Sequence, residues 1–131
     1  AVNSKLLVAY SGSTTNADIN SIYAYNITET VSSVTVGAAN KIYDANQYPT
    51  TYPYLLYGIS EMVLDPTDNS LYIATAINTA TTIVNYAIEK FSYDATQIGV
   101  SNSSVLTRSG STPFYDYGGD TKCIADMMIA D

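Results

Sequence analysis

The sequence predicts an all-β protein from its composition, from short apolar runs between turn residues, and from the lack of helical periodicity. Strands favour Thr, Tyr, Val and Ile, and the 131 residues include 13 Tyr among many Ser, Thr and Asn. Lys and Glu, which usually cover the exposed faces of helices, are scarce. Apolar residues do not recur at spacings of three and four over any long window, so we expect no long amphipathic helix.

The expected strands follow one another along the whole chain, separated by clusters of Gly, Pro, Asn and Asp. One of these clusters, DPTDN at residues 65–69, is a strong turn signal between two apolar runs. In chain order, the expected strands cover residues 6–10, 22–27, 34–36, 59–64, 71–74, 86–93, 105–107 and 124–129.

The composition also excludes several function classes. Five basic residues against 12 acidic ones give a net charge of −7, which cannot neutralise a track of phosphates, so nucleic acid is excluded as a partner. A chain with no His and a single Cys excludes zinc fingers, Ser-His-Asp or Cys-His catalysis and an internal disulfide. No apolar stretch approaches the ~18 residues that a membrane-spanning helix needs. Low charge with abundant Tyr, Thr and Asn favours an extracellular or cell-surface location, although no signal peptide opens this chain.

Three pairs of segments indicate an internal repeat with a period of 65 or 66 residues. Residues 6–9 (LLVA) align with residues 71–74 (LYIA) at an offset of 65. Residues 22–27 (IYAYNI) align with 88–93 (IEKFSY) at an offset of 66, and 59–64 (ISEMVL) with 124–129 (IADMMI) at 65. Each match is weak because short apolar strands resemble one another, so the shared offset is what predicts the repeat.

One stretch of the chain resembles a known group of proteins. Residues 58–74 (GISEMVLDPTDNSLYIA) are similar to the inner hairpin of a blade in the NHL-repeat, YVTN and lactonase-like β-propellers. Such a hairpin has an apolar strand, an Asp-Pro-x-Asp-Asn turn and then a Leu-Tyr-Ile-Ala strand. The resemblance implies antiparallel four-stranded blades, a superfold that serves many functions.

Under this interpretation the chain contains about two blade equivalents. Residues 1–57 form an incomplete first blade without its inner strand, 58–121 a full second blade, and 122–131 the inner strand of a third. Propellers close with ~4–8 blades, so two cannot form a ring. We expect either a fragment of a larger propeller, which the end of the chain inside a strand favours, or a subunit whose last strand completes the first blade of a neighbouring copy.

The long connections carry most of the clustered aromatic residues. Residues 48–54 (YPTTYPY) and 113–120 (PFYDYGGD) lie at equivalent places in the connections 41–57 and 109–122, on the face where 11–21 and 77–85 also emerge. Tyr combines a rigid apolar ring with a hydroxyl, which suits sugar rings and peptide backbones. The alternative is that these rings fill the gap between blades. The candidate ligand-binding residues are Tyr48, Tyr52, Tyr54, Phe114, Tyr115, Asp116, Tyr117 and Asp120.

The spacing of the acidic residues does not indicate a metal site or a catalytic site. Residues 65–69 lack the spacing of an EF-hand loop and are typical of a tight turn. Asp116 and Asp120 near two glycines form a weak metal candidate. Glu61 and Asp126 occupy matching places on inner strands, but the Asn residues that accompany such carboxylates around the calcium of lactonase-like propellers are not evident. We therefore expect no catalytic residue, metal or cofactor, and solvated carboxylates at both positions.

The sequence is compatible with three functions. The first is a non-enzymatic binding module for protein or carbohydrate, with a Tyr-rich loop face as its binding surface. The second is a structural subunit of an oligomer or filament, completed by strand exchange between chains. The third, a lactonase-like hydrolase, ranks last because the chain has no His and no clustered acid–base pair.

Overall fold

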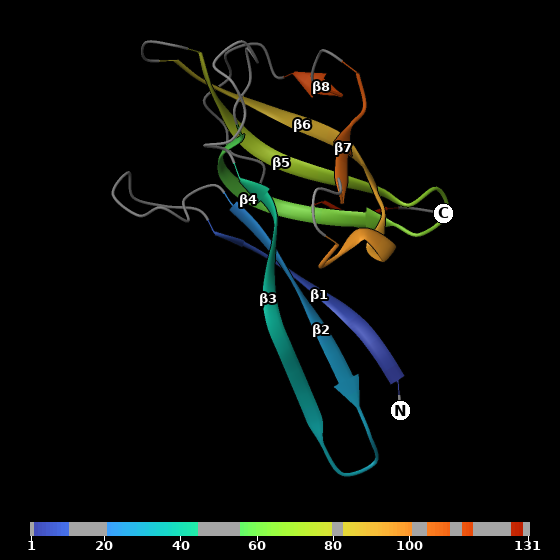
Figure 1. Cartoon of the computed structure of the whole chain (residues 1–131). Helices are drawn as coiled ribbons and strands as arrows, with labels where there is room; N and C mark the ends of the chain where they lie inside the picture. The colour runs from blue at the N-terminus through green and yellow to red at the C-terminus, as the bar shows by residue number, and fades with distance from the viewer. Residues whose placement is uncertain are drawn as a thin grey trace.

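The computed structural model describes residues 2–10, 21–44, 56–79, 83–100, 105–110, 114–116 and 127–129. These residues form two antiparallel sheets (Figure 1), so the all-β prediction is confirmed. The first sheet has the strand order β1 (Val2–Tyr10), β2 (Ser21–Glu29) and β3 (Val34–Asp44). The second sheet runs β4 (Leu56–Asp65), β5 (Ser70–Thr79), β6 (Ile83–Tyr93) and β7 (Leu106–Arg108), and β8 (Tyr115–Asp116) also pairs with β6.

Local sequence explains the turn between β4 and β5. Asp65 accepts a hydrogen bond from the Thr67 backbone at 2.9 Å, and Asp68 accepts one from the Ser70 backbone at 3.0 Å. Asn69 has a φ of 55°, a left-handed conformation that Asn adopts more readily than most residues. The prediction of a tight turn at residues 65–69 is therefore confirmed.

Most strands are longer than the sequence predicts, and several expected connections are correspondingly shorter. Residues 41–44, expected in a connection, extend β3 because they pair with the start of β2, where Tyr43 lies opposite Ile22. Tyr115 and Asp116, also expected in a connection, pair with Ile88 and Ala87 of β6. The C-terminal strand expected at 124–129 is not formed at 127–129, and 124–126 lie outside the described residues.

One face of the second sheet packs against the end of the first sheet that carries the start of β2 and the end of β3. The first sheet contributes Ile22 and Tyr43 to this contact, and the inner face of the second sheet contributes Leu71, Ile73 and Phe91, all nearly or fully buried. The rings of Tyr43 and Phe91 meet edge to face, with their centroids 6.0 Å apart. Burial of these apolar side chains is the main favourable contribution to folding, at about 25 cal/mol per Å² removed from water.

The two hairpins that the repeat relates pair in the same register. In the first sheet Leu6 lies opposite Tyr25, and in the second Leu71 lies opposite Phe91. The offset of 65 carries Leu6 to Leu71, and the offset of 66 carries Tyr25 to Phe91. Two offsets found separately in the sequence thus describe one pairing pattern in the structure.

An ion pair is buried in the inner face of the second sheet. Arg108 donates from Nε and Nη2 to the two carboxylate oxygens of Glu89 at 2.8 and 2.9 Å. The Arg108 side chain is 9% exposed and that of Glu89 1%. Two parallel hydrogen bonds compensate for the lost hydration of both charges, and they join the short strand β7 to β6.

We expect Arg108→Met to lower the free energy of unfolding by about 3–5 kcal/mol, because it leaves the Glu89 carboxylate buried without its cation. The double variant Glu89→Leu/Arg108→Met removes both charges and is expected to recover most of that loss. Urea denaturation of the three proteins measures both effects. A double variant as unstable as Arg108→Met would contradict this account of the pair.

Candidate functional site

Three of the eight residues predicted to bind ligand lie in the described part of the chain. Phe114 and Tyr115 are 59% and 53% exposed, and Asp116 ends β8. The predicted loop location is wrong for Tyr115 and Asp116, because they extend the edge of the second sheet beside β6. The other five predicted residues, Tyr48, Tyr52, Tyr54, Tyr117 and Asp120, lie outside the described residues.

Phe114 and Tyr115 belong to a larger aromatic surface on the side of the second sheet that faces away from the first. Tyr72 and Lys90 lie opposite each other on β5 and β6, and therefore share this face. Tyr115 pairs with Ile88, two residues before Lys90, which places it on the same face. We name this surface the outer face of the second sheet, and it comprises Tyr72, Ile88, Lys90, Phe114 and Tyr115.

A lysine and two rings form the centre of this surface. The rings of Tyr72 and Phe114 meet edge to face at 5.2 Å. The Lys90 ammonium lies 5.1 Å from the centroid of Tyr72 and 6.0 Å from that of Phe114, within range of a cation–π interaction. It also donates to the Asp68 carboxylate at 3.2 Å. An exposed aromatic surface with a fixed charge beside its rings can bind a sugar ring or an apolar side chain.

The charged groups of this surface stabilise each other. The pKa of Lys90 lies above its usual value because the Tyr72 hydroxyl and then the Asp68 carboxylate favour the ammonium form. The pKa of Asp68 lies below its usual value, first because Ser70 hydrogen-bonds its carboxylate and second because Lys90 does. Both groups are therefore charged at neutral pH.

A second aromatic surface, which the sequence pattern did not indicate, lies on the face of the first sheet that does not join the core. The rings of Tyr10 and Tyr23 meet edge to face at 5.3 Å, and the hydroxyls of Tyr10 and Tyr25 are 3.4 Å apart. Lys41 lies over Tyr23, 5.4 Å from its centroid. The alternation of Tyr23 and Tyr25 along β2 is the signal that could have placed both rings on one side. We name this surface the outer face of the first sheet, and it comprises Leu6, Val8, Tyr10, Tyr23 and Tyr25.

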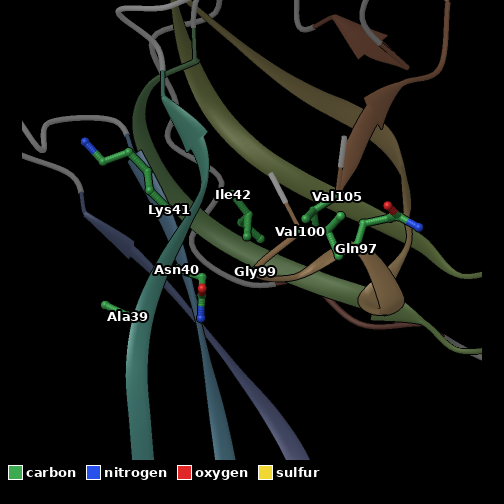
Figure 2. A pocket seen from close by; sticks show the side chains of 8 residues that line it. All are labelled: Ala39, Asn40, Lys41, Ile42, Gln97, Gly99, Val100 and Val105. Atoms are coloured by element: carbon green, nitrogen blue, oxygen red, sulfur yellow. The ribbon is translucent and has the colours of Figure 1, made fainter. Parts of the chain in front are cut away.

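A cavity of about 320 Å³ lies between β3 and the segment that follows β6. Figure 2 shows that Ile42 and Val105 line it from the two sides, while Lys41 directs its amine away. Asn40 supplies a polar side chain on its wall, and this amide donates to the Ala38 carbonyl at 3.1 Å. The full lining is Ala39, Asn40, Lys41, Ile42, Gln97, Gly99, Val100 and Val105. Because the Asn40 amide is already hydrogen-bonded to the backbone, this cavity is a weaker candidate for a ligand-binding site than the aromatic surfaces.

The acidic residues have local roles where the structure describes them. The half-buried Glu61 accepts a hydrogen bond from the Met62 backbone at 3.3 Å, and Asp126, its predicted counterpart, lies outside the described residues. Within the described ranges, no three Cys, Asp or Glu residues gather closely enough to hold a metal ion. The same ranges contain no helix of the length and apolarity needed to cross a membrane.

We expect Lys90→Gln to raise the pKa of Asp68 part of the way to its ordinary value, because the Ser70 bond remains after the cation is lost. A carboxyl with a lowered pKa stabilises the fold above its unfolded-state pKa, and this contribution disappears as the pH falls through the folded-state value. The variant should therefore lose less stability on acidification. An NMR titration of the Asp68 carboxyl carbon measures the shift. Lys5→Gln on the first sheet is the control, and an unchanged Asp68 pKa in Lys90→Gln would refute the coupling.

The chain was compared with protein-family models, curated proteins and solved structures, and none of them matches it. The function is therefore inferred from the two aromatic surfaces and the internal repeat of this chain.

Proposed function

We propose that the chain is a non-enzymatic β-propeller-type module that binds a protein or a carbohydrate through the aromatic outer face of its second sheet. In this proposal β1–β3 are the outer three strands of one blade and β4–β8 a complete blade. The location that accompanies this function is extracellular or at the cell surface, as the low charge and the abundance of Tyr, Thr and Asn favour.

Two features support the blade interpretation. The strand order follows the chain order over β1–β3 and over β4–β7, as in the meander of a propeller blade, and β8 also pairs with β6. The pairs Leu6–Tyr25 and Leu71–Phe91 occupy equivalent registers under the repeat. Two sheets packed through one face each are also the arrangement of a β-sandwich, and the repeat register is the reason to prefer blades.

The binding role depends on one observation, the exposure of Phe114 and Tyr115 beside a fixed cation. Phe114 is 59% exposed although its ring contacts Tyr72, so a ligand can reach its free side. Exposed aromatic side chains that lie next to a polar group are typical of binding surfaces, because they lose little side-chain entropy when a ligand binds. Lys90, held by Asp68, supplies a charge-assisted donor to the same ligand.

The double variant Phe114→Ala/Tyr115→Ala is expected to weaken binding about ten-fold or more, because aromatic anchors contribute most of the binding energy of such surfaces. Affinity electrophoresis in laminarin, xylan or glucomannan tests carbohydrate, and selection from a phage-displayed peptide library followed by titration of the selected peptides tests protein. The matched control is Val31→Ala/Val34→Ala, which removes two exposed apolar side chains from the turn between β2 and β3 and from the start of β3.

Binding that is lost in the aromatic variant and kept in the control supports the proposal. It fails if wild-type chain binds none of these probes and does not bind itself, or if the aromatic variant binds as well as wild type. Thermal unfolding of both variants shows that the fold is retained, and little change is expected because all four side chains are exposed.

A further inference from the structure

We propose that the outer face of the second sheet binds the outer face of the first sheet in another copy of this chain, so that copies associate head to tail. This inference rests on the proposed function, because it names the partner of the same aromatic surface. It follows from the way in which the two sheets of one copy already pack.

The contact between the two sheets of one copy joins surfaces that are not equivalent. On the first sheet, Leu7 and Ala9 of β1 pack into the core together with the buried Ile22 of β2. The repeat relates β1 and β2 to β5 and β6 of the second sheet, which contribute Leu71 and Phe91 to the core. The repeat relates Leu71 to Leu6, which lies on the other face of β1 from Leu7. The two sheets therefore contribute faces that the repeat does not relate to each other.

The two outer faces are therefore the repeat equivalents of the two faces that already pack against each other within one copy. The repeat carries Leu71 and Phe91 of the inner face to Leu6 and Tyr25, which lie on the outer face of the first sheet. It also carries Ile22 to Ile88, which lies on the outer face of the second sheet. A second copy placed with its first sheet on this second sheet repeats the arrangement that each copy contains internally.

The sequence of β1 fits a strand that is covered on both sides. Residues 6–9 are LLVA, a continuous apolar run rather than an alternation of apolar and polar residues. Such runs are typical of strands with both faces buried. The core covers Leu7 and Ala9, whereas Leu6 on the other face is 47% exposed. Cover by a second copy explains why that face is apolar.

The two outer faces both carry apolar and aromatic side chains that can pack against each other. The first sheet offers Leu6 and Tyr10, which is 42% exposed, beside the rings of Tyr23 and Tyr25. The second sheet offers Phe114 and Tyr115 around the Lys90 ammonium, and a lysine binds favourably to the face of a tyrosine ring. Because the contact joins two different surfaces, it is heterologous and builds a ring or a filament.

Two variants, each with one altered outer face, test the inference. The first-face variant is Leu6→Glu/Tyr10→Glu, and the second-face variant is Phe114→Glu/Tyr115→Glu. We expect wild-type chain to associate in sedimentation-velocity runs at concentrations up to about 1 mM, the range of weak specific contacts. Each variant alone should associate about ten-fold or more weakly than wild type.

Mixing the two variants distinguishes a head-to-tail contact from a symmetric one. Each variant keeps the face that the other has lost, so the mixture should form a 1:1 complex that grows no further. The quadruple variant, with both faces altered, should remain monomeric in every mixture. Circular dichroism and the urea midpoint of each variant show whether the fold is kept, and Leu6→Ala/Tyr10→Ala and Phe114→Ala/Tyr115→Ala replace any variant that does not fold.

The inference is overturned if wild-type chain stays monomeric, if either variant associates as wild type does, or if the mixture forms no 1:1 complex. These results leave the proposed function standing when Phe114→Ala/Tyr115→Ala still weakens binding of a polysaccharide or a selected peptide. If that variant keeps both its self-association and its probe binding, both proposals are overturned.

Discussion

The structure depends on the packing of one sheet face against another. A small chain cannot shield both faces of two sheets by itself, and Ile22, Tyr43, Leu71 and Phe91 form the part of the core that it does shield. The Arg108–Glu89 pair lies in that same face, where its two hydrogen bonds keep the end of β7 attached to β6. The aromatic surfaces have their positions because they are the sides left outside this contact.

The sequence predicts much of this fold because its turns and its strand composition are strong local signals. The turn at 65–69 forms as expected, since Asp65, Asp68 and Asn69 each have a local reason to bend the chain. The ends of the strands could not be predicted so well. Residues 40–44 include Asn, Lys and Asp, which disfavour strands, and they join β3 only because β2 offers a paired edge. This pairing depends on tertiary structure, and the local sequence does not indicate it.

The candidate site could be predicted only in part, for a related reason. Phe114 and Tyr115 stood out because aromatic residues cluster around them, whereas Tyr72 and Lys90 are ordinary strand residues until β5 and β6 pair. The surface on the first sheet was missed because LLVA at residues 6–9 is apolar at every position. Such a run does not show which of its two faces the core covers, and only the packing of the second sheet decides it.

The order of strands in both sheets has a consequence for how the chain folds. The strands β1–β3 and β4–β7 each pair with their neighbours in sequence, so most of these hairpins close a short loop and can form early. The contact of Tyr43 with Phe91 joins residues far apart in the sequence, and the entropy of closing that long segment must be overcome before the core is complete. Docking of two preformed sheets should therefore limit the folding rate, and substitutions in the turns should change that rate less than substitutions of Tyr43 or Phe91.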